Sequence, residues 1–338
     1  MKPNYYKIVE GISSLLLEVN QRKDIEDDED GLFIVKKANE ALSHAKTITN
    51  PRSLWKTFWY EGEIACLFSD SNLGKSIYAV QIANEIAKTD KILYFDFELS
   101  EKQFQLRYTS DTTNELHSFP PYLYRVEINC DKLDPYSFEE IVIDEIKKLA
   151  IKLDVKIIII DNLTYLCSAM EKAEAAGTLM QRLISLKKLY GFSFMILAHT
   201  PKRQLWAQIT QNDLQGSKRL YNLFDSVFAI GQSAKDEDLR YIKELKVRWG
   251  RKTYGENNVI VAKIEKIGSF LQFTEKGNAH EFEHLKQSAE ETREEIAKTI
   301  EDLRKKGVSY RSIGEQLSMP KSTVESIDKR TRRKKARN

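Results

Sequence analysis

The chain has 338 residues, of which 41% are hydrophobic and 30% charged, enough for one large domain with one or two small ones and a sizeable core. The longest purely aliphatic stretch, Ile157 to Ile160, is far shorter than the ~20 residues of a membrane helix, and the first residues lack the apolar segment of a secretory signal. The three cysteines form no CxxC pair, so we expect a cytoplasmic protein with reduced thiols and no membrane contact.

The net charge of +3 is unevenly distributed along the chain. Residues 329–338 carry seven basic side chains and no acid, which leaves 46 basic against 50 acidic residues in the remainder. Positive charge gathered at one end can meet a polyanion, although a solvated tail that keeps the protein soluble is the simpler alternative.

In chain order, residues 1–50 have a polar helical pattern, with six acids among the seven positions 24–30, and indicate a helical or linker segment. From 51 to 275, short apolar runs alternate with amphipathic helical patterns, which predicts an α/β core with a mostly parallel sheet. The later strands follow one another closely and predict antiparallel hairpins at the sheet edge. The expected strands are 63–68, 91–97, 156–161, 192–198, 225–231, 239–247, 258–264 and 270–273.

A phosphate-binding loop is expected between the strand 63–68 and the helix after it. The segment is Ser69-Asp70-Ser71-Asn72-Leu73-Gly74-Lys75-Ser76. In such a loop, backbone N–H groups face the anion, Lys75 would reach the β/γ-phosphates, and Ser76 would ligate Mg²⁺. Ser69 replaces the first glycine of the usual G-x-x-x-x-G-K-[ST] pattern, so an ordinary strand–helix turn is the alternative.

Two further expected strands end in carboxylates. The strand 156–161 ends in Asp161, which can hold Mg²⁺ through water beside the phosphates. The strand 91–97 is followed by Glu98, which can act as a general base on the attacking water. The simpler alternative for Glu98 is a surface carboxylate at a helix start. The three elements together predict hydrolysis of a nucleotide.

Over roughly residues 52–275 the chain resembles the RecA-like ATPases, especially hexameric helicases of the DnaB type and plasmid RepA helicases. The resemblance lies in the ordered motifs 95–100, 194–200, 213–217 and 246–250. It implies that Glu98 is catalytic, that His199 senses the γ-phosphate, and that 213–217 faces single-stranded DNA in a central channel. It also implies that Lys246 and Arg248 reach a neighbouring subunit's nucleotide in a homo-oligomer, such as a hexameric ring.

Spacing gives a second reason to single out Lys246 and Arg248. Both alternate with Val247 on the expected strand 239–247 and so point to one face, where Glu244 can neutralise one of them. One cation is then left without a partner, which argues against burial of these two side chains in the core. A solvated, charged strand edge is the simpler alternative.

A polar linker, 276–288, leads to a small all-α unit, 289–330, and a basic tail, 331–338. Apolar residues in the all-α unit have the spacing of two short helices across a tight turn, with Gly314 allowing their close approach and Pro320 suiting a first helical turn. The segment resembles the helix-turn-helix of resolvase-type recombinases. That resemblance implies duplex DNA contacts by Lys321, Ser322, Thr323, Ser326, Arg330, Arg332 and Arg333. A three-helix interaction module without nucleic acid is the alternative.

These features together predict an ATP- and Mg²⁺-dependent motor that acts on DNA, similar to the RepA helicases of plasmids and mobile elements. Two rival functions stay open. One is a DNA-binding regulator in which ATP controls assembly without unwinding. The other is an ATPase that loads or remodels another protein on DNA.

Overall fold

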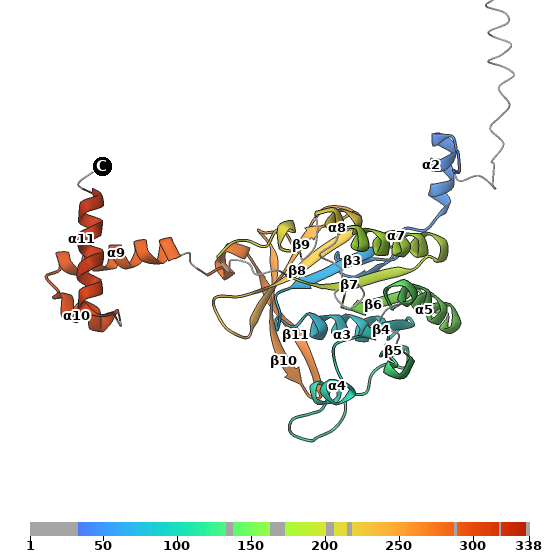
Figure 1. Ribbon diagram of the computed structural model, residues 1–338, viewed down its shortest axis with the longest axis horizontal. Helices are drawn as coiled ribbons and strands as arrows, with labels where there is room; N and C mark the ends of the chain where they lie inside the picture. Colours follow the sequence, from blue (N-terminus) through green and yellow to red (C-terminus); the bar gives the residue numbers. More distant parts are fainter. Residues whose placement is uncertain are drawn as a thin grey trace, which may run out of the picture. The chain divides into compact units, whose positions relative to one another are not determined.

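A nine-stranded sheet organises the core of the computed structural model, which describes residues 33–132, 138–162, 173–200, 206–214, 218–286, 289–317 and 319–335 (Figure 1). Six neighbouring strands are parallel, and the last three along the chain add antiparallel hairpins at one edge. The α/β class, the mostly parallel sheet and the edge hairpins are therefore confirmed. In spatial order the strands are β11 (Phe270–Ala279), β10 (Val259–Ile267), β9 (Leu239–Lys246), β8 (Ser226–Gln232), β3 (Ile64–Ser69), β7 (Ser193–His199), β6 (Ile157–Asp161), β4 (Ile92–Asp96) and β5 (Leu123–Val126).

Helices cover both faces of this sheet, because its central strands are apolar on both sides. Alternate residues of β3 join opposite cores: Ile64, Cys66 and Phe68 face one, and Ala65 and Leu67 the other. The first core is covered by α5 (Phe138–Leu153), α7 (Ala173–Tyr190) and α8 (Lys218–Leu223). The second is covered by α3 (Lys75–Ile86) and by a small hairpin of β1 (Ser53–Trp55) and β2 (Trp59–Tyr60).

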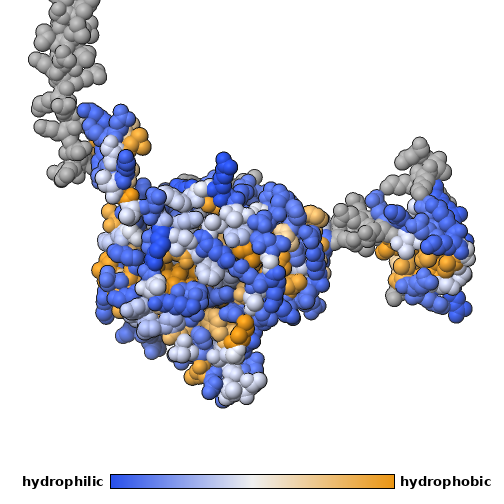
Figure 2. Space-filling view, turned by 180° about the vertical axis from the view of Figure 1, so that it is seen from behind, coloured by the Kyte–Doolittle hydropathy of each residue, from blue (hydrophilic) through white to orange (hydrophobic). Residues whose placement is uncertain are grey.

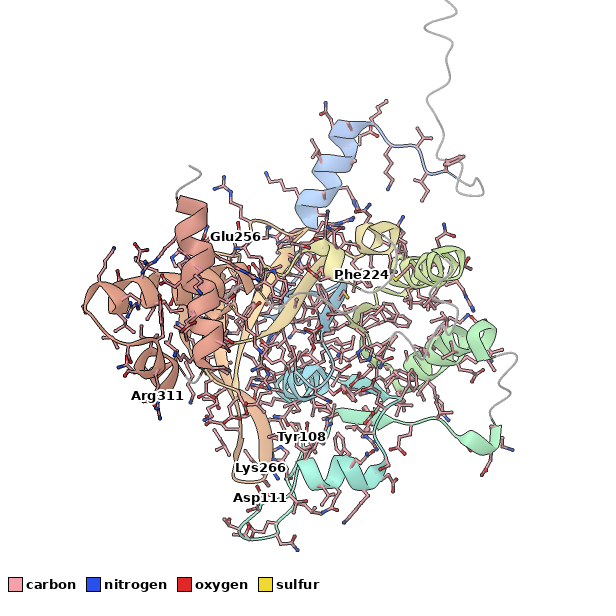
Figure 3. The ribbon with its side chains drawn as sticks, turned by 60° about the vertical axis from the view of Figure 1, so that its left-hand side comes forward. Tyr108, Asp111, Phe224, Glu256, Lys266 and Arg311 are labelled. Atoms are coloured by element: carbon pink, nitrogen blue, oxygen red, sulfur yellow. The ribbon has the colours of Figure 1, made fainter. Side chains whose placement is uncertain are left out.

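The hairpin of β10 and β11 links α3 to the segment around α4 (Glu101–Arg107). Gln81 of α3 exchanges two hydrogen bonds with the backbone of Phe273, at 2.8 and 3.1 Å. Lys266, near the hairpin tip, donates to the Thr109 carbonyl at 3.0 Å and pairs with Asp111 at 2.7 Å (Figure 3). The hairpin thus ties together two segments that lead away from the phosphate loop and from Glu98.

The N-terminal unit, described here from residue 33, contains helix α2 (Ala38–Thr47), which buries none of its residues. Large apolar side chains on and beside it are exposed, as the orange residues among the blue ones in Figure 2 show. They are Phe33, Ile34, Val35, Leu42 and Ile48. The acidic run 24–30 lies outside the described residues.

Three helices make up the C-terminal unit: α9 (Ala289–Lys305), α10 (Tyr310–Gln316) and α11 (Lys321–Lys335). Ile300, Ile313 and Val324 form its buried centre, one from each helix. A Cβ atom on Gly314 would lie 2.5 Å from the Met319 carbonyl oxygen, so the expected close approach at this glycine is present. Pro320 directly precedes α11, and α11 continues to Lys335, so residues 331–335 of the expected tail are helical.

No helix in the described ranges combines the length and apolarity that crossing a bilayer requires.

Candidate nucleotide-hydrolysis site

The phosphate loop lies between β3 and α3, as expected. Gly74 occupies the N-cap position of α3 with φ +92°, a left-handed backbone that favours glycine. A Cβ atom there would also lie 2.8 Å from Ile264 Cδ1 and 3.0 Å from the Phe273 ring. Gly74 is therefore required by its backbone and by the hairpin that packs on it.

Ser69, where the usual pattern has glycine, is the buried last residue of β3 and has no left-handed φ. Its hydroxyl donates to the Asp70 carbonyl at 2.8 Å. The backbone at this position accommodates a side chain, which explains how the loop forms without that glycine.

The carboxyl ends of four parallel strands bring the polar residues together. Ser69 lies opposite His199 in the β3–β7 register, and Asp96 lies opposite Asp161 in the β4–β6 register. Because parallel strands end at the same sheet edge, Glu98, two residues beyond Asp96, reaches this edge too.

A chain of polar contacts connects Lys75 to Glu98. The Lys75 amine lies 3.2 Å from His199 Nδ1 and 3.3 Å from the Ser69 carbonyl oxygen. His199 Nε2 lies 3.3 Å from Glu98 Oε1, and Asn162 donates to the same oxygen. A protonated Lys75 that donates to Nδ1 leaves the imidazole proton on Nε2, facing Glu98.

Three of these ionisable groups have shifted pKa values. Burial lowers the pKa of the Lys75 amine, against the opposing effect of Asp161 and Glu98. The hydrogen bond from His199 lowers the pKa of Glu98, so this carboxylate is ionised at neutral pH. Burial raises the pKa of Asp161 to about 6, although the hydroxyls of Ser76 and Tyr94 oppose the shift.

Asp161 and Ser76 fit a magnesium ion. Tyr94 donates to Asp161 Oδ2 at 2.7 Å, whereas the buried Oδ1 has no hydrogen-bond partner within the described residues. An unsatisfied carboxylate oxygen beside a serine hydroxyl offers the hard oxygen ligands that Mg²⁺ prefers at phosphate sites.

A family model described as "AAA domain" matches residues 35–204, half of the chain. The chain belongs to this AAA domain family. The match and the fold confirm a RecA-like P-loop ATPase core, and the family implies ATP, typically with Mg²⁺. The likeness of the core to DnaB-type and RepA helicases, and that of the C-terminal unit to resolvases, stays an expectation.

Among solved structures, a KaiC-like protein of the hyperthermophilic archaeon Pyrococcus horikoshii OT3 aligns with a TM-score of 0.45 and 13% identity, covering 64% of this chain and 91% of that one. No curated protein matches the sequence.

Lys246 and Arg248 lie near the amino ends of the parallel strands, whereas the AAA domain's phosphate loop lies at their carboxyl ends. Lys246 pairs with Val227 and Ala65 with Ser226, near the amino ends of β8 and β3. The strand β3 spans roughly 17 Å, so neither cation can serve the nucleotide of its own chain.

The contacts of both cations differ from those expected. The strand β9 ends at Lys246, so the alternation argument does not extend to Arg248. Arg248 pairs with Asp225 at 3.1 Å, while Lys246 donates to carbonyl oxygens at the end of α8, among them that of Phe224 at 2.6 Å. Glu244 neutralises neither cation. Its carboxylate is fully buried and accepts hydrogen bonds from the Thr57 hydroxyl and from the backbone N–H groups of Thr253 and Tyr254.

The residues expected to contact duplex DNA lie on α11. Lys321, Ser322, Ser326, Arg330 and Arg332 are exposed, and Thr323 is half-buried. Arg332 pairs with the buried Asp328 at 3.0 Å, so its charge is partly neutralised within the C-terminal unit. The side chain of Arg333 and the channel-loop residues 215–217 lie outside the described parts.

Sequence reasoning missed Asn162, Asp96 and Arg125 as residues near this site. Asn162 and Asp96 had a signal, because each adjoins or ends a strand whose carboxyl end carries a predicted site residue. Arg125 had none of that kind, since its strand β5 was not expected.

Proposed function

We propose that this AAA-domain ATPase is a DNA-acting motor of the RepA-helicase kind, in which Glu98 is the general base. The observation that carries the catalytic part is the chain of contacts from Lys75 through His199 to Glu98. Lys75 comes from α3, His199 from β7 and Glu98 from the connection after β4, and they meet beside the buried, partly unsatisfied Asp161.

In this proposal Lys75 binds the β/γ-phosphates, and Ser76 and Asp161 hold Mg²⁺, whose charge offsets that of the phosphates. Glu98, kept ionised by His199, accepts the proton of the attacking water on its carboxylate. His199 contacts both Lys75 and Glu98, so it is placed to relay the presence of a γ-phosphate between them.

DNA binding is supported by α11, which presents an exposed face of basic and hydroxyl side chains on a compact three-helix unit. Duplex DNA would bind there, and single-stranded DNA would bind the core of a homo-oligomeric, hexameric ring. A regulator without unwinding activity and an ATPase that loads another protein on DNA remain the rival functions.

The test is ATP hydrolysis by the full chain, with and without single-stranded DNA, with molecular mass measured in parallel. Lys75→Ala should lose nucleotide binding. Glu98→Gln should bind ATP but hydrolyse it about 10²- to 10⁴-fold more slowly, because an amide cannot accept the water's proton. Glu101→Gln, which removes an exposed acid three residues further on, should keep the parental rate. Hydrolysis by Glu98→Gln at the parental rate would show that Glu98 is not the base.

Strand displacement on a forked duplex separates the three functions. ATP-dependent displacement supports the motor, whereas ATP-dependent DNA binding without displacement favours the regulator. Co-purification of a nuclease, relaxase or transposase with the DNA-bound protein favours the loader.

A further inference from the structure

Glu98 is carried by a short connection rather than by a helix or strand. It lies between Asp96, the last residue of β4, and Ser100, which caps α4 through a capping box with Gln103. The position of its carboxylate therefore depends on what holds the backbone of residues 97–100.

The Asp96 carboxylate holds that backbone from one side. Asp96 is 2% exposed, and its Oδ1 accepts the N–H groups of Glu98 at 3.2 Å and Leu99 at 2.9 Å. Such a turn, in which an aspartate accepts from the backbone two and three residues further on, fixes the direction in which Glu98 leaves the strand.

Arg125 of the neighbouring strand β5 completes the arrangement. Its Nε donates to Asp96 Oδ2 at 2.9 Å, and a terminal nitrogen donates to the Leu99 carbonyl at 2.7 Å. Its guanidinium also lies over the Phe104 ring of α4, 4.6 Å from the ring centroid. One side chain thus contacts the carboxylate, the backbone and the helix that together surround Glu98.

We propose that Arg125 is a positioning residue for Glu98. Through Asp96 and the Leu99 carbonyl, it holds the Glu98 backbone so that the carboxylate stays in place beside His199 and the attacking water. The inference rests on the proposed role of Glu98 as general base. A lysine at position 125 cannot make all of these contacts, because only the planar guanidinium of arginine presents donors in two fixed directions.

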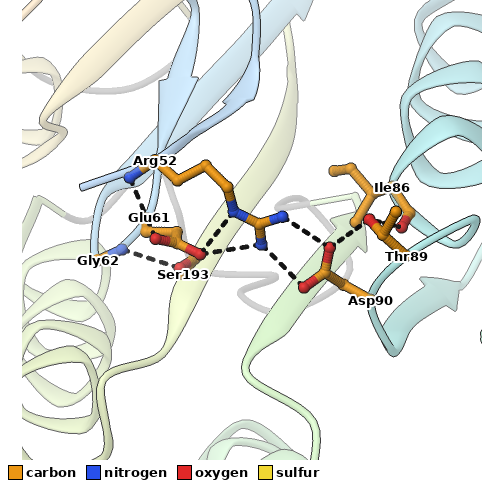
Figure 4. A network of polar contacts seen from close by, with 7 residues as sticks. All are labelled: Arg52, Glu61, Gly62, Ile86, Thr89, Asp90 and Ser193. Carbon is orange, nitrogen blue, oxygen red and sulfur yellow. Dashed lines mark hydrogen bonds and ion pairs between the residues drawn. The ribbon is translucent and has the colours of Figure 1, made fainter. Parts of the chain in front are cut away.

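The chain offers a matched control in Arg52. Its guanidinium also bridges two acceptors, pairing with Asp90 at 2.8 Å and Glu61 at 2.9 Å (Figure 4). This cluster ties the β1–β2 hairpin to Asp90, two residues before the amino end of β4, while Asp96 lies at the carboxyl end, ~13 Å along the strand. Loss of Arg52 tests what breaking an arginine–carboxylate cluster does away from the site.

The experiment compares Arg125→Met, Arg125→Lys and Arg52→Met in the full chain, measuring kcat, KM, affinity for a fluorescent ATP analogue and the thermal midpoint. Methionine keeps the apolar contact with Phe104 but loses every donor. We expect Arg125→Met to lower kcat about 100-fold with nucleotide affinity within about threefold, because a misplacement near 1 Å has an effect of that size. Arg125→Lys should lower kcat about tenfold, and Arg52→Met should keep the parental kcat.

Parental kcat in folded Arg125→Met overturns the proposal. If Arg125→Met does not fold, parental kcat in Arg125→Lys, which keeps the charge beside Asp96, overturns it equally. An equal loss of kcat in Arg52→Met also overturns it, since the effect is then one of general destabilisation. The role of Glu98 fails separately: it is wrong if Glu98→Gln hydrolyses ATP at the parental rate, whatever Arg125 does.

Discussion

Ser69 begins the phosphate loop at a position where many such loops have glycine. Glycine is needed where φ is left-handed or where a Cβ atom has no room, and both conditions hold at Gly74. At Ser69 the backbone belongs to β3, and the side chain hydrogen-bonds to the next carbonyl. The left-handed backbone of this loop therefore lies at Asn72 and Gly74 and not at Ser69.

Ser69→Gly should consequently leave ATP affinity within about threefold of the parent, since the change relieves no strain and removes only one local hydrogen bond of ~1 kcal/mol. Titration with a fluorescent ATP analogue measures this. Gly74→Ala is the matched variant at the other end of the loop and should abolish binding. A tenfold gain in affinity in Ser69→Gly would mean that serine does impair the loop.

At this scale, the residues of the candidate site were predictable where chemistry coincides with a strand end. Lys75, Asp161 and His199 each sit at the end of an apolar run or directly after a loop, and parallel strands bring such ends together. The pairings of Lys246, Arg248 and Glu244 were not predictable. They depend on the exact end of β9 and on backbone groups of α8 and of residues 253–254, which no local pattern specifies.

At the scale of elements, the eight expected strands are present: the parallel ones of this set are compact apolar runs that the sheet buries, and β9 to β11 have more mixed, partly alternating sequences that suit the sheet edge. The strands β1, β2 and β5 were not expected. β1 and β2 have three and two residues, too few for a pattern, and every residue of β5 is only half-buried, so alternation is weak. Because β5 was not predicted, Arg125 was not predicted to lie beside Asp96 either.

The predicted contacts with duplex DNA lie on helix α11. Its inner face packs through Val324 and Asp328, and its exposed face includes Lys329 and Arg330. Because the helix continues to Lys335, removing residues 329–338 would shorten it and remove the Arg332–Asp328 pair as well as the charge. Substitution is the cleaner test.

Lys329→Gln with Arg330→Gln should weaken duplex binding and flatten its salt dependence. Each lost phosphate contact removes about 0.9 from the slope of log affinity against log salt, so the double variant should lose about 1.8. Fluorescence anisotropy across a salt series measures the slope. Lys305→Gln with Lys306→Gln removes the same charge from exposed positions at the end of α9 and should leave the slope unchanged. Equal slopes in the parent and the α11 variant would show that this face is merely solvated.

At the scale of the whole molecule, the two sheet edges have complementary chemistry. The carboxyl edge holds the phosphate loop and Glu98, and the amino edge holds Arg248. The side chain of Arg248 is 61% exposed, whereas its partner Asp225 is buried and also pairs with Lys187 at 2.7 Å, so departure of Arg248 does not leave the Asp225 carboxylate without a cation. Arg248 can therefore leave Asp225 at little cost, whereas Lys246 is held by three carbonyl groups at the end of α8.

We expect that Arg248 completes the nucleotide site of an adjacent protomer. Arg248→Ala should then bind ATP normally but hydrolyse it on the order of 10³-fold more slowly, as loss of an arginine that stabilises γ-phosphate charge does in other NTPases. Mixing Arg248→Ala with Glu98→Gln should restore activity, because about a quarter of head-to-tail interfaces then combine an intact Glu98 with an intact Arg248. A mixture of Glu98→Gln with Lys75→Ala is the control and should stay inactive, since every protomer in it has a broken nucleotide site. If Arg248→Ala and Glu98→Gln co-assemble, as mass measurement can establish, and turnover still does not return, Arg248 does not complete the nucleotide site of an adjacent protomer.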